Sequence, residues 1–176
     1  MPVSQLATTA TVVGGAAVLA TYVVVFRNYR EGYTSSAHPF WLGYSKPTIQ
    51  TLVALQLAAV VGFFLFAIPW LFIEQPQGGV LGSSAALTVT LGMFMLASAA
   101  WAPCMRQALT TRLLSWKLAS CMALWVAAAC SIVLVAGAAE ENKPRWYVLL
   151  GVILFAMTTV LADGVAYTAR TIVTVK

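Results

Sequence analysis

The stretch TTVLADGVAYTAR, residues 158–170, places one carboxylate, Asp163, within an apolar segment near the C-terminus. A charged group at the centre of a membrane-spanning helix costs about 2.5–3.5 kcal/mol on insertion scales, so such groups usually face the protein interior and often mark function. On a helix, Thr159, Tyr167 and Arg170 project on the same side as Asp163, and apolar residues project on the other. We therefore expect Asp163 to point into a helical bundle.

Two roles for Asp163 fit this pattern. In a structural role, it joins helix ends by accepting a hydrogen bond from Thr159 or Tyr167, or by pairing with a basic side chain. The basic candidates are Arg27, Arg30 and Arg106, and Arg170 lies two helical turns away. In a functional role, it binds a proton or a cation on a polar path, and Gln56 in another apolar segment is a second polar anchor.

The segment that follows the first apolar run is both basic and aromatic. Residues 27–46 read RNYREGYTSSAHPFWLGYSK. Such a segment suits an ordinary loop at the membrane surface, or a site that docks on lipid headgroups or on a partner. The docking candidates are Tyr33, His38, Phe40, Trp41 and Tyr44. His38 is the only histidine, and a single histidine does not make a metal site.

Several chemistries are disfavoured by the residues that the sequence lacks. One histidine excludes a bis-histidine haem, and cysteines 104, 121 and 130 form no CxxC motif. No lysine lies deep in an apolar segment, as a retinal Schiff base would require. Glycine-rich nucleotide-binding motifs and the GxSxG nucleophile motif are also missing. We therefore expect a protein that is not an enzyme and has no metal or cofactor, although a bound lipid or pigment is left open.

The composition indicates which elements position these residues. The chain has 176 residues, of which 61% are hydrophobic and 9% are charged. Soluble domains carry about 25% charged residues, and a chain this short cannot hide so much apolar surface by itself. We expect an all-α integral membrane protein with a single transmembrane domain over residues 1–176. The net charge of +5 is spread over loops, which indicates membrane topology and not nucleic-acid binding.

Apolar runs of about 20 residues predict a compact bundle of five transmembrane helices. They cover residues 6–26, 48–73, 84–101, 116–138 and 146–169. Ser45 and Pro47 predict the start of the second helix, Pro69 a local kink or end within it, and Pro103 the end of the third. The first run is expected to be a retained helix and not a signal peptide, because no basic residue precedes Arg27.

The basic residues predict an orientation. Eight of the ten fall on one side of the predicted membrane: Arg27, Arg30, Lys46, Arg106, Arg112, Lys117, Arg170 and Lys176. Only Lys143 and Arg145 fall on the other side. Because positive loops stay on the inner side, the N-terminus is expected outside and the C-terminus inside. The sequence does not identify the membrane.

Three functional hypotheses follow. Rows of small residues at every third or fourth position in several helices are typical of close helix packing, within one chain or between subunits. Together with the aromatic and basic loop, they favour a structural or accessory subunit of a larger membrane assembly. The expected partners are then the bilayer and other membrane subunits or further copies of the chain. The alternative is a small oligomeric channel or transporter for protons or small ions with Asp163 on its path, and a weaker one is a lipid or pigment binder.

Overall fold

The computed structural model describes residues 5–30, 32–33, 35–74, 76–141 and 145–174. This part of the chain is helical and contains no strand. Five helical stretches are long and apolar enough to cross a membrane, which agrees with the five predicted segments. They are α1 (Gln5–Phe26), α2 (Lys46–Ile68) with its π-helical extension η2 (Pro69–Ile73), α3 (Ser84–Thr111), α4 (Leu114–Ala139), and a last stretch of α5 (Trp146–Ala156), η4 (Met157–Tyr167) and α6 (Thr168–Thr174).

The start of α2 and the role of Pro69 are as predicted. The Ser45 hydroxyl accepts a hydrogen bond from the Thr48 amide, and Pro47 lies in the first turn, where its missing N–H costs nothing. At Pro69 the α-helical pattern ends and one π-helical turn follows. Proline causes this change because it lacks the N–H that would bond to the preceding turn.

The prediction that Pro103 ends the third helix was wrong. Pro103 lies inside α3, which continues to Thr111 and is followed by Arg112 in the left-handed region at a φ of 57°. In apolar surroundings an irregular break would expose several backbone groups, whereas a proline removes only one hydrogen bond and is tolerated within long apolar helices. The fourth and fifth helices also extend past their predicted ends, to Ala139 and Thr174.

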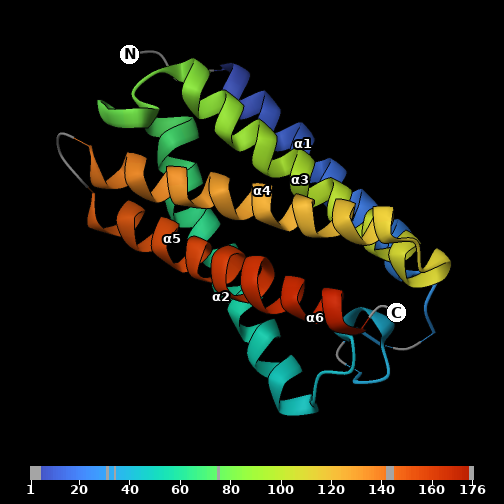
Figure 1. The fold of residues 1–176 in the computed structure, drawn as a ribbon. Helices are drawn as coiled ribbons and strands as arrows, with labels where there is room; N and C mark the ends of the chain where they lie inside the picture. The colour runs from blue at the N-terminus through green and yellow to red at the C-terminus, as the bar shows by residue number, and fades with distance from the viewer. Residues whose placement is uncertain (1–4, 31, 34, 75, 142–144, 175–176) are drawn as a thin grey trace.

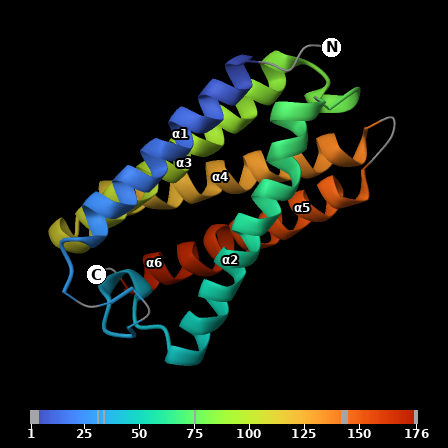
Figure 2. The ribbon, with the colours of Figure 1, turned by 180° about the vertical axis from the view of Figure 1, so that it is seen from behind.

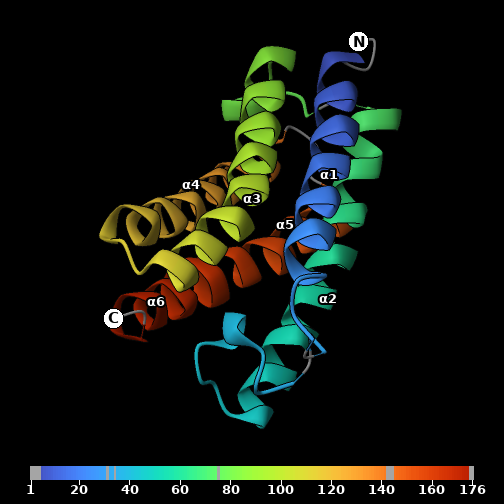
Figure 3. The ribbon, with the colours of Figure 1, turned by 90° about the vertical axis from the view of Figure 1, so that its right-hand side faces the viewer.

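The helices are arranged around α4 and α5. Figure 1 shows α1 beside α3, and α4 beside the last helical stretch. Figure 2 shows α2 crossing α5 on the opposite face of the bundle. At this crossing Gly62 and Gly151 bring the two backbones together, since a Cβ at either glycine would lie 2.6–2.7 Å from the carbonyl oxygen of the other. Figure 3 shows the C-terminal part of α3 diverging from α1.

The two ends of the bundle differ in charge. We call one end, formed by residues 27–46, the α3–α4 turn and α6, the basic end. Its described charged residues are Arg27, Arg30, Lys46, Arg106, Arg112, Lys117 and Arg170. The acidic end, formed by the α2–α3 and α4–α5 connections, carries Glu74, Glu140, Glu141 and Arg145. The N-terminus lies at the acidic end and the C-terminus at the basic end. Which end faces inside stays a prediction, and Lys143 and Lys176 lie outside the described residues.

Candidate functional site

Asp163 lies in η4, where the last helical stretch widens from α-helix to π-helix over Met157–Tyr167. π-helical turns within α-helices are rare and frequently occur at functional sites. Side chains from other elements bond to backbone carbonyls of this segment. The Trp125 indole of α4 donates to the Gly164 carbonyl at 3.0 Å, and the Tyr44 hydroxyl donates to the Ala166 carbonyl at 2.9 Å. The part of the widened segment that directly follows Asp163 is therefore held by α4 and by Tyr44.

Asp163 lines a cavity of about 50 Å³ to which all five long helical stretches contribute. A cavity of about 10–15 Å³ on this measure already accommodates one water molecule when it is polar. The polar lining consists of Tyr22, Gln56, Ser98, Trp101, Thr159 and Asp163. Phe94, Ala97, Ala123, Leu124 and Ala127 complete the wall. The cavity is therefore polar and large enough for water or a small ion.

The Asp163 carboxylate has no partner among the described residues. The only ion pair in this part of the chain joins Arg145 and Glu141 at 3.2 Å, at the acidic end. No described side chain or amide donates a hydrogen bond to the carboxylate, and the one side-chain bond to Asp163, from the Thr168 hydroxyl, goes to its backbone carbonyl. The buried Trp101 indole N–H, on the same cavity, also lacks a hydrogen-bond partner within the described part of the chain. A polar ligand in the cavity would satisfy both groups.

The structure divides the predicted polar cluster around Asp163 into two sets. Gln56 and Thr159 line the cavity together with Asp163. The Thr159 hydroxyl, however, donates to the Ser131 hydroxyl at 2.7 Å and not to the carboxylate. Tyr167 lies closer to the basic end, where its hydroxyl donates to the Phe40 carbonyl.

Arg170 also belongs to the basic end. Its guanidinium donates to the Leu42 carbonyl at 3.0 Å and to the Gly43 carbonyl at 3.2 Å. Arg170 therefore attaches α6 to the first loop, the segment between α1 and α2, and does not pair with Asp163.

The three arginines that we considered as charge partners do not pair with Asp163 either. Arg27 and Arg30 are exposed at the basic end. Arg106 lies in a surface groove between α1 and α3. Burial raises the pKa of the Tyr29 phenol, and the neighbouring Arg106 guanidinium lowers it, which places Arg106 close to the first loop. A structural ion pair at Asp163 is therefore not present in the described part of the chain.

The predicted docking segment folds back onto the bundle. His38, Phe40 and Trp41 are each at most 2% exposed, while Tyr33 and Tyr44 are half-buried. The short 3₁₀-helix η1 (Pro39–Trp41) begins at His38, whose Nδ1 accepts a hydrogen bond from the Phe40 amide at 3.3 Å. The prediction that these aromatic side chains face headgroups or a partner is therefore corrected for His38, Phe40 and Trp41. Burial of large apolar rings between the helix ends is the physical reason.

This loop is hydrogen-bonded to the wall of the cavity. Tyr33 donates a hydrogen bond from its hydroxyl to Oε1 of Gln56 at 3.2 Å, and Gln56 lines the cavity. Burial raises the pKa of the Tyr33 phenol, the bond to Gln56 lowers it, and the Asp163 carboxylate raises it. The Asp163 carboxylate thus acts electrostatically on the Tyr33 phenol. The loop and the acid belong to one site.

The sequence did not single out Tyr22, Ser98 and Trp101 as site residues. Tyr22 and Trp101 lie near the ends of the predicted segments 6–26 and 84–101, where such side chains typically act as anchors at the membrane surface. Trp101 lies ten residues before the end of α3, or about 15 Å of helix, so its interpretation depended on the wrong helix end at Pro103. Had α3 been extended, the indole would have been expected inside the bundle with Asp163.

No described group of three or more His, Cys, Asp or Glu side chains is placed to hold a metal ion, and the three cysteines are unpaired. Comparison with known proteins gives no relative: no family model matches the chain, and no curated protein or solved structure is significantly similar to it. The function therefore has to be argued from the site alone.

Proposed function

We propose that this chain is a multi-pass membrane protein that binds a proton or a small monovalent cation at Asp163, as part of a small channel or transporter. The observation that carries the proposal is the Asp163 carboxylate, which has no partner among the described residues and lines a polar cavity shared by all five long helical stretches. A carboxylate in low-dielectric surroundings requires a positive charge nearby, and a proton or a bound cation supplies it.

The surroundings of the cavity support binding with controlled access. Toward the acidic end, the rings of Phe63, Phe66, Phe94 and Phe155 pack against one another with centroid distances of 4.8–5.8 Å. Toward the basic end, Tyr33 of the first loop is hydrogen-bonded to Gln56 of the cavity wall. An apolar layer on one side and a hydrogen-bonded loop on the other are barriers to an ion. Movement of the loop would open the site toward the basic end.

Flux in liposomes tests the proposal. The full chain, reconstituted with a pH-sensitive dye and then with Na⁺ or K⁺ gradients, is expected to conduct at least one of these ions. Asp163→Asn is expected to abolish that flux, because the amide cannot take up a proton or neutralise a cation. Glu74→Gln is the matched control, since it makes the same change at an exposed acid of the acidic end. Flux that Asp163→Asn leaves unchanged, or a wild-type protein that moves none of the three ions, overturns the proposal.

A structural or accessory subunit is the second candidate, and α1 favours it. Only Ala7, Thr11 and Val25 of its 22 residues are buried, so most of the α1 surface is free for contact with another subunit. Gly15 faces open space, which would allow a neighbouring helix to approach closely. Mass measurement of the complex extracted in mild detergent should then give an oligomer or a stoichiometric partner, and a bare monomer counts against this candidate.

A further inference from the structure

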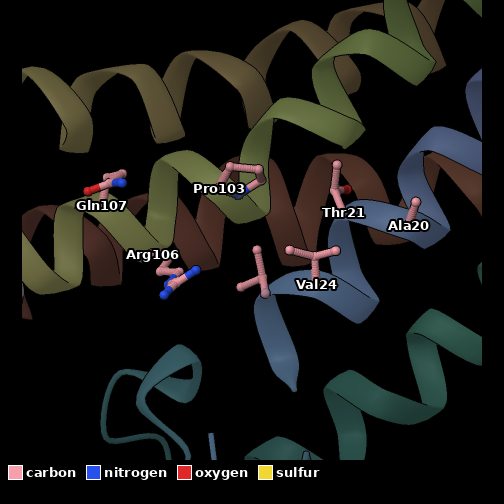
Figure 4. Close-up of a pocket in the computed structure, with 7 residues that line it drawn as sticks. Ala20, Thr21, Val24, Pro103, Arg106 and Gln107 are labelled. Atoms are coloured by element: carbon pink, nitrogen blue, oxygen red, sulfur yellow. The ribbon is translucent and has the colours of Figure 1, made fainter. Parts of the chain in front are cut away.

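A surface groove of about 270 Å³ runs between α1 and α3 near the basic end (Figure 4). Thr21 and Val24 of α1 lie on one side of it, and Pro103 and Arg106 of α3 lie on the other. The complete lining is Ala20, Thr21, Val24, Val25, Pro103, Arg106 and Gln107. The groove lies apart from the Asp163 cavity, with which it shares no residue.

The groove forms because the two helices separate. At Gly14 they are in close contact, since a Cβ there would lie 2.6 Å from the Cβ of Met95. Beyond this point α3 diverges from α1 toward its C-terminal end (Figure 3). The small side chains of Ala20 and Thr21 leave the gap unfilled, and Val24 is 47% exposed beside it. The walls are therefore mainly apolar and open to the surroundings of the bundle.

Arg106 gives the groove a charged end. Its guanidinium makes no hydrogen bond and no ion pair with the described residues. It acts electrostatically on the phenol of Tyr29, whose pKa it lowers against the larger effect of burial. The described acids other than Asp163 lie at the opposite end of the bundle. Arg106 therefore has no counter-charge among the residues that the structure describes. It lies five residues before the end of an apolar helix, at the level at which lipid headgroups would lie.

We propose that this groove binds an anionic phospholipid, with an acyl chain along Ala20 and Val24 and the phosphate at Arg106. An acyl chain matches the open apolar walls, and a guanidinium forms strong, often bidentate hydrogen bonds to phosphate oxygens. Basic pockets between transmembrane helices are a recognised kind of lipid headgroup site. A zwitterionic lipid offers the same chains but carries a second, positive charge that Arg106 repels.

Native mass measurement of the full chain tests this proposal. The protein, purified in detergent, is given phosphatidylglycerol or phosphatidylcholine with identical acyl chains. The wild type is expected to retain one phosphatidylglycerol in preference to phosphatidylcholine. Arg106→Gln is expected to weaken that retention roughly tenfold or more, because a hydrogen bond to a charged group contributes about 1.5–3 kcal/mol. Arg106→Lys keeps the positive charge but loses the two parallel N–H donors of the guanidinium, so it should retain the lipid at an intermediate level.

Arg112→Gln is the matched control, because Arg112 is exposed at the α3–α4 turn and does not line the groove. It should retain phosphatidylglycerol like the wild type. Equal retention of the two lipids by the wild type, or an unchanged preference in Arg106→Gln, overturns the proposal. A loss in Arg112→Gln as large as in Arg106→Gln also overturns it, since general surface charge would then explain the binding. Helical circular dichroism of each variant confirms that the proteins compared are folded.

Discussion

Asp163 differs from every other acidic residue that the structure describes. Glu74 accepts a hydrogen bond from the Gln77 amide at 2.8 Å, and Glu140 accepts one from the Val80 backbone at 2.9 Å. Glu141 accepts from the Trp70 indole at 2.7 Å and pairs with an arginine. These three accept hydrogen bonds at the acidic end, whereas no described donor bonds to the Asp163 carboxylate in its cavity. The contrast supports the proposed ion-binding role of Asp163 and supports no such role for the three acids at the acidic end.

Tyr167→Phe tests the attachment of the first loop at the level of one atom. The hydroxyl of Tyr167 donates to the Phe40 carbonyl, and its removal leaves a buried acceptor without that donor. The free energy of unfolding should fall by about 0.5–1.5 kcal/mol. Thermal unfolding in detergent, followed by circular dichroism, measures the change. Tyr147→Phe is the control, because no described group bonds to that hydroxyl, and an equal loss in both variants would contradict the assignment.

Part of the site could be predicted from residue types alone. The position of Asp163 on the polar side of its helix, one turn from Thr159, follows from helical periodicity and hydropathy. Gln56 could be named as a polar residue of another segment, but its place beside Asp163 is known only from the structure. The partners of Tyr167 and Arg170 could not be predicted, because both bond to backbone carbonyls of the first loop. Every residue presents such a carbonyl, so the sequence carries no signal for the choice. Asp163 could therefore be identified from the sequence, whereas the hydrogen bonds that Tyr167 and Arg170 make to the first loop could not.

The close crossing of α2 and α5 predicts that alanine substitutions at two glycines, Gly151 and Gly15, have very different effects on stability. In Gly151→Ala the new methyl group would meet the Gly62 carbonyl, so the helices must move apart. The protein should lose about 1–3 kcal/mol of stability, as overpacked cores do. A Cβ at Gly15 would meet no other atom within 4 Å. Gly15→Ala should therefore leave the stability unchanged or raise it slightly, since alanine favours the helix. Chemical or thermal unfolding in detergent compares the two, and similar midpoints would refute the close crossing.

The existence of the five long helices could be predicted, but their internal irregularities could not. Hydropathy reports length and apolar character, which is sufficient to find each segment. The change to π-helix over η4 is accompanied by contacts from Trp125 and Tyr44, which lie 39 and 122 residues from the carbonyls they bond. The effect of Pro103 could not be predicted for the same reason: contacts between distant residues decide it. The packing around α3 determines whether the helix ends at this proline or continues through it.

The charge difference between the two ends of the whole molecule predicts its topology. We expect the basic end, with the C-terminus, on the inner side of the membrane, because basic loops are retained there. A fluorescent protein fused to the C-terminus should be fluorescent inside the cell or organelle and protected from external protease. The same fusion at the N-terminus should be accessible from outside. A protected N-terminal fusion together with an accessible C-terminal one would reverse the orientation.

The attachment of the first loop to the last helix also sets an order of assembly. The bonds from Tyr167 and Arg170 reach residues 127 and 128 positions earlier in the chain. At 5–20 residues per second, the ribosome needs roughly 6–25 s to make the intervening segment. During that time residues 27–45 have emerged but their anchors do not yet exist. The basic end is therefore the last part of the molecule to close, and a chain interrupted before Tyr167 would leave its first loop without these anchors.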